Sequence, residues 1–310
     1  MTLRAVVTPL RTPDRPGPGP MPDALLRALD VQVKRRIDGL LQGDFQATTL
    51  GPGIELAQVR RYEPGDDVRQ IEWNVTARTG YPHVRVHVAE RNLTSCVLLD
   101  ASPSMSFGTA DRRKVDVAEG VALALGHFAS TRGNQLRTHA YGRPLPSAFS
   151  LRSGRRGMLG LLRTLRDDAP HSQEPAAQLD DALHVALDGL RGRSAVFVVS
   201  DFRDEPSWRR GLIKVAHRHD VVAVEVGDPR EQELVDVGDT WFVDPETGRQ
   251  VRVDTHDRHL RERFVAAAES ERRETRRLIR STGADLVQLS TRGDWLRALT
   301  LFLAHRKRRP

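Results

Sequence analysis

Cysteine, lysine and long apolar runs are scarce in this chain of 310 residues. Cys96 is the only cysteine, which excludes an intrachain disulfide, and its place in an apolar run favours a packed structural thiol. No apolar run approaches the about 20 residues of a membrane-spanning helix, and the N-terminus lacks the apolar core of a signal peptide. We therefore expect a cytoplasmic protein without a membrane span.

The formal net charge is +7, and almost all of the 48 basic residues are arginines. Lysine is confined to Lys34, Lys114, Lys214 and Lys307. Acidic residues are interleaved with the arginines, as in Arg261-Glu262-Arg263, a pattern typical of solvated helix faces with local ion pairs. Nucleic-acid binding remains an alternative that depends on charge alone.

The chain divides into segments of different composition. Residues 1–21 are rich in proline and glycine and predict a disordered tail, and residues 22–50 hold a predicted helix at 23–41. Residues 51–93 predict strands, because Val84, Val86 and Val88 alternate with polar residues. Residues 94–306 alternate strands with helices.

That alternation predicts an α/β fold with a doubly wound, mostly parallel sheet. The predicted strands lie at 96–100, 135–141, 195–200, 221–226 and 285–289, and the predicted helices at 112–131, 155–167, 179–190, 207–218, 257–282 and 293–306. A predicted hairpin, 240–243 with 249–253, interrupts the series. We expect it to join the strands of 54–88 in a small discontinuous β subdomain, made of 51–93 and 236–254.

Two apolar runs end in an aspartate, at Asp100 and at Asp201. If both runs are parallel strands of one sheet, the two carboxylates emerge at the same edge, where such sheets bind ligands. Ser102 and Ser104 add hydroxyls beside Asp100. An all-oxygen cluster of this kind suits a hard cation such as Mg²⁺. The alternative is that these residues simply cap the start of a helix.

The Asp-x-Ser-x-Ser motif at 100–104 resembles the metal-ion-dependent adhesion site of von Willebrand factor A domains. Further segments are similar to the signature of the bacterial domain-of-unknown-function 58 family: Glu55, Arg61–Trp73, Ala77-Arg78, Gly227–Glu231 and Asp244–Gly248. The resemblance implies a von Willebrand A-like, Rossmann-type domain. It also implies that Asp100, Ser102 and Ser104 surround Mg²⁺ or Mn²⁺, with Asp201 in support.

The chain departs from the adhesion-site pattern at one ligand. Ala177 stands where the pattern has a threonine, so the cation would keep an extra water and bind weakly, or the site would hold none. Thr138 or Thr164 could replace that hydroxyl, although nothing in the sequence brings either to the site.

The resemblance implies a non-enzymatic role as an adaptor or co-chaperone of a MoxR-type AAA+ ATPase and its client proteins. The loop Ala101–Phe107 and the segment Asp201–Asp204 would form the contact face, with Phe107 and Phe202 as aromatic anchors.

A metal-dependent phosphohydrolase that uses Asp100 is the rival interpretation. Phosphatases of the haloacid dehalogenase type use Asp-x-Asp, however, and Ser102 occupies the second position. The chain also has no phosphate-binding loop, no Gly-x-Ser-x-Gly nucleophile elbow and no His-Glu-x-x-His motif. We therefore expect no enzymatic activity.

The segment Tyr62–Trp73 has two interpretations. Arg69, Glu72 and Trp73 could form a structural hydrogen-bonded corner between the β subdomain and the main sheet, which we favour, or a surface that binds a partner.

Overall fold

The computed structural model describes residues 16–43, 54–89, 94–129, 135–144, 152–166, 176–204, 206–244 and 248–305. The chain forms two compact units, a larger one of Met1–Gln42 with Leu93–Pro310 and a smaller one of Gly43–Asn92. Residues 1–15 of the predicted tail and residues 245–247 of the predicted hairpin loop lie outside the described residues. Within the described ranges, no helix is both long enough and apolar enough to cross a membrane.

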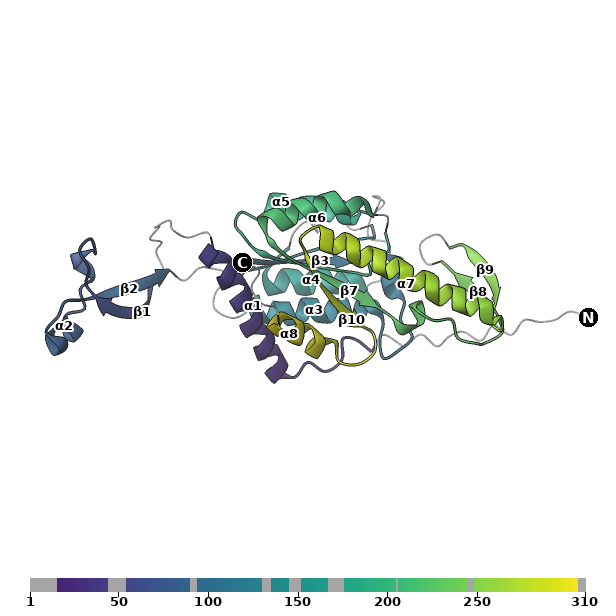
Figure 1. Cartoon of the computed structure of the whole chain (residues 1–310), viewed down its shortest axis with the longest axis horizontal. Coiled ribbons are helices and arrows are strands. Elements are labelled where there is room, and N and C mark those ends of the chain that lie inside the picture. The colour runs from purple at the N-terminus through teal and green to yellow at the C-terminus, as the bar shows by residue number, and fades with distance from the viewer. Residues whose placement is uncertain are drawn as a thin grey trace, which may run out of the picture. The chain divides into compact units, whose positions relative to one another are not determined.

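The larger unit is built on one six-stranded sheet (Figure 1). Its strands are β3 (Thr94–Asp100), β4 (Gln135–Tyr141), β5 (Arg152–Ser153), β6 (Ala195–Ser200), β7 (Asp220–Gly227) and β10 (Asp285–Ser290). Across the sheet they run β10-β7-β6-β3-β4-β5, and all neighbours are parallel except the short edge strand β5. Counted in chain order from β3, this is the 3-2-1-4-5-6 order of a doubly wound Rossmann-type sheet.

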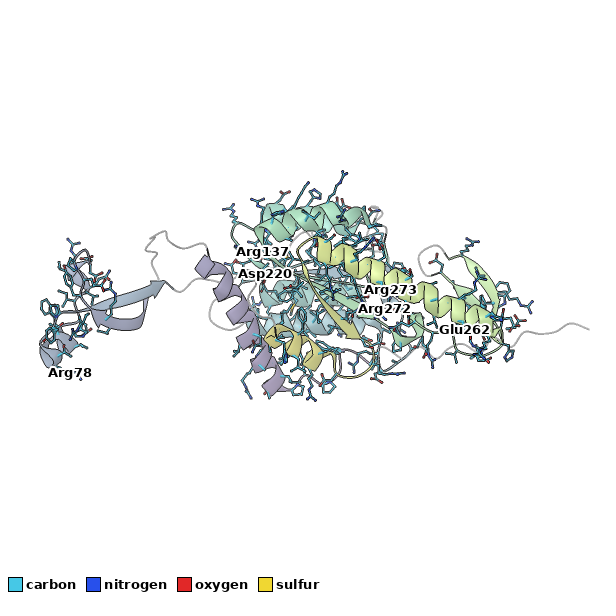
Figure 2. All side chains as sticks on the ribbon, in the orientation of Figure 1. Arg78, Arg137, Asp220, Glu262, Arg272 and Arg273 are labelled. Carbon is cyan, nitrogen blue, oxygen red and sulfur yellow. The ribbon has the colours of Figure 1, made fainter. Side chains whose placement is uncertain are left out.

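Helices cover both faces of this sheet. They are α1 (Asp23–Gly43), α3 (Lys114–Ala129), α4 (Gly154–Arg166), α5 (Leu179–Gly189), α6 (Arg209–Arg218), α7 (Arg258–Ser281) and α8 (Trp295–His305). Because side chains alternate along a strand, Val97 and Leu99 of β3 enter the core under α1, α3, α4 and α8, whereas Cys96 and Leu98 enter the core under α5, α6 and α7. Charged side chains lie along α7, among them Glu262, Arg272 and Arg273 (Figure 2).

The predicted fold class is confirmed. Each of the five predicted strands from 96 to 289 is present, and these five are the parallel strands. The sequence did not predict β5, because two residues are too few to show a periodicity.

The predicted discontinuous β subdomain is wrong. The hairpin forms as β8 (Asp239–Val243) and β9 (Gln250–Asp254), but the two strands pair only with each other and belong to the larger unit. The base of the hairpin is closed within that unit, since the amide of Thr255 donates to the Gly238 carbonyl (2.9 Å). Alternation identified the strands and could not identify their partners.

The smaller unit is an antiparallel pair, β1 (Ile54–Arg61) and β2 (His83–Ala89), joined by a folded connection. That connection holds the 3₁₀ helix η1 (Val68–Gln70) and the short helix α2 (Trp73–Thr79). The Glu72 carboxylate caps α2 by accepting from the Asn74 amide (3.3 Å), and Gly80, at φ 74°, ends the helix in the left-handed conformation.

Candidate functional site at the carboxyl edge of the sheet

Asp100 and Asp201 meet where the strand order of the sheet reverses. Asp100 is the last residue of β3, Asp201 directly follows β6, and these two strands are adjacent. The chain leaves β3 for the face covered by α3 and leaves β6 for the face covered by α6. Such a reversal opens a crevice at the carboxyl ends of the strands, which is the usual ligand site of open α/β sheets.

The carboxylate of Asp100 is buried and accepts a hydrogen bond on each oxygen. The amide of Ser102 donates to Oδ1 (2.9 Å) and the hydroxyl of Ser200 donates to Oδ2 (2.6 Å). Burial, and then the nearby charge of Asp201, raise the pKa of Asp100 to about 6 despite these bonds. Asp100 therefore holds a buried negative charge that an added cation would stabilise.

Ser102 and Ser104 direct their hydroxyls toward each other. Ser102 begins the 3₁₀ helix η2 (Pro103–Ser106), and its Oγ lies 3.1 Å from Ser104 Oγ. Octahedral Mg²⁺ holds its ligands at about 2.0–2.1 Å, so neighbouring ligand oxygens lie about 3 Å apart. The spacing of the two hydroxyls therefore fits two neighbouring ligands of a hard cation, beside the Asp100 carboxylate that the Ser102 amide contacts. No cluster of three or more His, Cys, Asp or Glu side chains suited to a metal occurs among the described residues.

Gly142 and Ala177 lie beside the segment Asp100–Ser102. Gly142 has φ 85°, and a Cβ there would lie 2.6 Å from the Ser102 amide nitrogen and 2.8 Å from Asp100 Oδ1. The Gly142 amide donates to the Ala177 carbonyl (2.8 Å), so the position that lacks the threonine lies next to the Asp100 loop. Thr138 lies within β4 and pairs with Val97, which keeps its hydroxyl away from the strand end.

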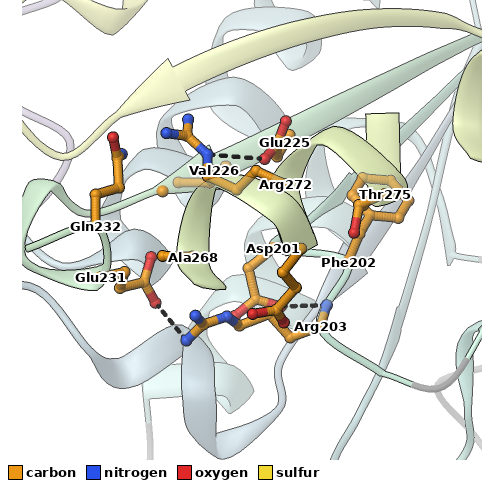
Figure 3. Close-up of a pocket in the computed structure, with 12 residues that line it drawn as sticks. Asp201, Phe202, Arg203, Glu225, Val226, Glu231, Gln232, Ala268, Arg272 and Thr275 are labelled. Carbon is orange, nitrogen blue, oxygen red and sulfur yellow. Dashed lines mark hydrogen bonds and ion pairs between the residues drawn. The ribbon is translucent and has the colours of Figure 1, made fainter. Parts of the chain in front are cut away.

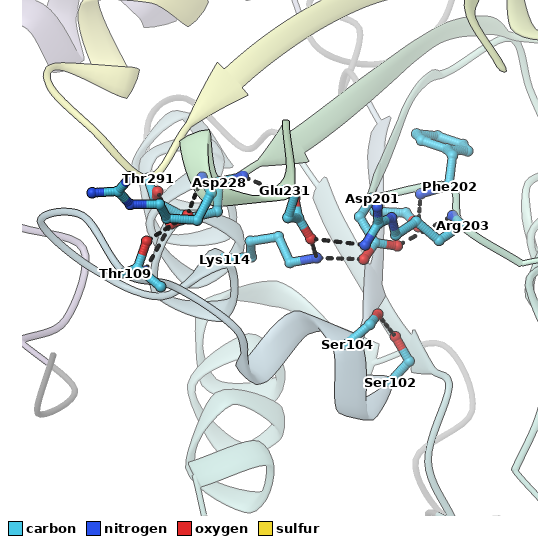
Figure 4. Close-up of polar contacts among 12 residues, drawn as sticks. Ser102, Ser104, Thr109, Lys114, Asp201, Phe202, Arg203, Asp228, Glu231 and Thr291 are labelled. Carbon is cyan, nitrogen blue, oxygen red and sulfur yellow. Dashed lines mark hydrogen bonds and ion pairs between the residues drawn. The ribbon is translucent and has the colours of Figure 1, made fainter. Parts of the chain in front are cut away.

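Asp201 is already paired with a cation from the protein. The ammonium of Lys114 is completely buried and donates to Asp201 Oδ2 (2.6 Å) and to Glu231 Oε1 (2.7 Å), as Figure 4 shows. Arg203 adds a second contact to Glu231 (3.2 Å). Asp201 is therefore paired with Lys114. Because the ammonium offsets the negative charge of this carboxylate, Asp201 attracts a metal ion less strongly.

Asp228 ties three strand-end loops together. Its carboxylate accepts from the amide and hydroxyl of Thr109 (2.8 and 2.7 Å) and from the hydroxyl of Thr291 (2.6 Å). Its own amide donates to Glu231 Oε2 (2.9 Å), which links it to the Lys114 pairs. Burial alone would raise the pKa of Asp228, but the hydrogen bonds outweigh it and hold that pKa below the usual value.

A pocket opens beside this network, between the ends of β6 and β7 and the helix α7 (Figure 3). Charged side chains line much of it, among them Asp201, Arg203, Glu225 and Arg272. Its volume is about 40 Å³, against the several hundred Å³ that a small-molecule site occupies. This pocket is therefore too small to enclose a nucleotide or a metabolite.

The two predicted aromatic anchors, Phe107 and Phe202, differ in burial. Phe107 is half-buried, but Phe202 is buried and packs edge-on against Trp208, with 5.6 Å between the ring centroids. The prediction that Phe202 offers an exposed aromatic ring is therefore wrong. With φ 53° at Phe202, the chain turns the ring inward under α5 and α6.

The segment with Glu72 and Trp73, predicted as a corner between two parts of the chain, is described here within the smaller unit alone. Glu72 is buried and caps α2, as a structural corner requires, but Trp73 beside it is 69% exposed.

Comparison with known proteins identifies the family. A model described as "protein of unknown function DUF58" matches residues 58–274, more than half of the chain. The chain belongs to this DUF58 family. Uncharacterized proteins Mb1516 of Mycobacterium bovis and Rv1480 of Mycobacterium tuberculosis are each 41% identical to it over 289 residues, covering 92% of this chain and 90% of the relative.

Solved structures match at lower identity. The conserved hypothetical protein BatB from Bacteroides thetaiotaomicron is 14% identical, with a TM-score of 0.45, and the match covers 68% of this chain and 97% of that chain. A von Willebrand factor type A protein from Catenulispora acidiphila is 12% identical, with a TM-score of 0.36, and the match covers 70% and 42%.

Sequence reasoning missed Lys114, Ser200 and Gly142. A signal existed for Lys114, because lysine is rare in this arginine-rich chain and Lys114 follows the Asp100 loop. The ammonium of lysine is a compact point charge with three donors, and two of them go to Asp201 and Glu231. Asp228 and Glu231 lie in a segment that the family signature marks, but their partners become visible only in the fold.

Proposed function

We propose that this DUF58 protein is a non-enzymatic, cytoplasmic protein-binding module that acts as an adaptor or co-chaperone of a MoxR-type AAA+ ATPase and its client proteins. The observation that carries the proposal is the convergence of Asp100 with the Ser102 and Ser104 hydroxyls at the switch point of the sheet. The loop Ala101–Phe107 would contact the partner, with half-buried Phe107 as the aromatic anchor.

Asp100, Ser102 and Ser104 would hold Mg²⁺ or Mn²⁺ weakly. The ion would supply positive charge for a carboxylate of the partner. Two features support weak binding, because Ala177 offers no hydroxyl and Asp201 is engaged by Lys114.

The rival phosphohydrolase is less well supported. A nucleophilic Asp100 would have to reach phosphorus, yet its carboxylate is buried and both oxygens accept hydrogen bonds. Ser200 is buried as well, and its hydroxyl proton is directed at Asp100. The small volume of the neighbouring pocket also argues against a site that encloses a phosphate ester.

Titration calorimetry with MgCl₂ and MnCl₂ tests the cation site. We expect weak heats for the wild type, no heat for Asp100→Ala and unchanged heats for Asp188→Ala, a control in which an exposed aspartate of α5 is replaced. Equal heats from the wild type and Asp100→Ala would refute the assignment of Asp100 as a ligand.

Affinity for the MoxR-type ATPase of the source cell tests the partner. Surface plasmon resonance should give weaker binding for Phe107→Ala and for Asp100→Ala than for Asp188→Ala. An unchanged affinity for both site variants would exclude this edge as the contact face. Turnover of a phosphate monoester that Asp100→Asn abolishes would instead favour the hydrolase.

A further inference from the structure

The smaller unit exposes several large apolar side chains. Trp73 is 69% exposed, Val68 60% and Tyr81 57%. Each lies in the connection between β1 and β2, which contributes little to a core, since η1 and α2 contain no buried residue. Exposed side chains of this size gathered on one small unit are typical of interaction sites.

Backbone hydrogen bonds bring these positions together. The amide of Tyr62 donates to the Pro82 carbonyl (2.9 Å), and the amide of Glu72 donates to the His83 carbonyl (2.7 Å). Arg61, Trp73 and Tyr81 are the immediate chain neighbours of these bonded residues. The guanidinium of Arg61 lies over the Tyr81 ring, with 4.4 Å between its central carbon and the ring centroid. We call Arg61, Val68, Arg69, Trp73, Arg78 and Tyr81 the Trp73 surface.

The arginines of the Trp73 surface have no carboxylate partner among the described residues. Arg61 stacks on Tyr81, Arg78 donates only to the Asn74 carbonyl (3.3 Å), and no ion pair is formed by Arg69. Arg78 is exposed on α2 (Figure 2). None of these three guanidinium groups is paired with a carboxylate of the described residues, so each can pair with a carboxylate of a partner.

Three nearby carboxylates accept hydrogen bonds from groups of the same unit. Asp66 forms a bidentate pair with Arg60 (2.6 and 2.8 Å). Asp67 caps η1 by accepting from the Arg69 amide (3.0 Å), and Glu72 caps α2. Asp66, Asp67 and Glu72 are thus engaged by groups of the unit itself, whereas Arg61, Arg69 and Arg78 have no carboxylate partner among the described residues.

We infer that the Trp73 surface binds an acidic segment of a partner protein that also carries apolar side chains. Tryptophan, tyrosine and arginine are the residues enriched at the energetic centres of protein interfaces. A nucleic acid is the less suitable ligand, because the sequence Gly43–Asn92 has six arginines, no lysine and seven acidic residues. The partner contributes the carboxylates for Arg61, Arg69 and Arg78, and its apolar side chains cover Trp73.

Fluorescence anisotropy with the full chain tests this inference. The probe is a fluorescein-labelled peptide of glutamate and leucine with one phenylalanine, compared with its glutamine analogue and with single-stranded DNA. We expect the acidic peptide to bind more tightly than both. Trp73→Ala and Arg69→Glu should each weaken its binding about tenfold or more.

Trp241→Ala is the matched control, because Trp241 is also exposed (46%) but lies on the β8–β9 hairpin of the larger unit. It should leave the affinity unchanged. Arg69→Glu separates a binding effect from a folding effect, since the Arg69 side chain is exposed and makes no ion pair among the described residues. Equal binding of the glutamine analogue, tighter binding of the DNA, or an equal loss in Trp241→Ala would each overturn the inference.

Discussion

Replacing Lys114 by methionine should strongly destabilise the larger unit. The ammonium is completely buried between Asp201 and Glu231, whose side chains are themselves 5% and 13% exposed. Methionine has nearly the same length but leaves two buried carboxylates without their shared cation. Breaking a buried ion pair in this way costs about 3–5 kcal/mol. Among the described residues, Glu231 has a second cation, Arg203, to reduce that cost, and Asp201 has none.

Urea unfolding followed by tryptophan fluorescence measures this effect. Trp208 and Trp295 are buried in the larger unit and report its unfolding, whereas Trp73 and Trp241 are already exposed in the folded protein. Thermal unfolding should shift down by roughly 6–20 °C, at about 2–4 °C for each kcal/mol.

Lys214→Met is the control for this experiment, since Lys214 is exposed on α6 and its loss should change stability by less than about 0.5 kcal/mol. Adding Asp201→Asn and Glu231→Gln to Lys114→Met should recover part of the loss, because the isolated charges are removed. If the free energies of unfolding of Lys114→Met and Lys214→Met differ by less than about 1 kcal/mol, the buried ion pairs do not stabilise the fold as argued.

Three further predictions concern other residues of the larger unit. Phe202→Ala should cost about 3–5 kcal/mol in urea unfolding, since the ring is buried against Trp208; a loss below about 1 kcal/mol would contradict that packing. Gly142→Ala should cost about 1–3 kcal/mol, because φ is 85° and the new Cβ would clash with the Ser102 amide; wild-type stability would mean that the loop relaxes freely. Burial raises the pKa of Cys96 to about 12, so the thiol should resist a thiol reagent at pH 8 until urea unfolds the chain, and rapid labelling of the folded protein would disprove its burial.

Much of the larger unit was predictable because its strands obey local rules. The apolar runs around Val97 and Phe197 must be buried on both faces, and alternating helices between such runs leave few parallel topologies. The pairing of β8 with β9 alone was not predictable in the same way. An alternating strand of five residues has no signal for its partner, and chain connectivity decided the outcome.

In the candidate site, too, residues close in the chain were predictable and contacts between distant residues were not. The motif at 100–104 identified Asp100, Ser102 and Ser104, which are close in the chain, and the strand ends correctly brought Asp201 to the same edge. Lys114 lies 87 residues from Asp201 and 117 from Glu231, so its role depends on the assembled sheet. The inward turn of Phe202 depends on one backbone angle that sequence pattern does not reveal.

The connections among these residues bear on how the proposed contact face would bind a partner. Lys114 joins the loop after β6 to the loop after β7, and Asp228 joins the latter to the loops that hold Thr109 and Thr291. Each loop is held by a buried charge or by charge-assisted hydrogen bonds, so moving one of them alone would leave a polar group unsatisfied. A partner that docks on loops fixed in this way loses little conformational freedom on binding. The Lys114 network therefore favours a preformed contact face over one that forms only after a cation binds.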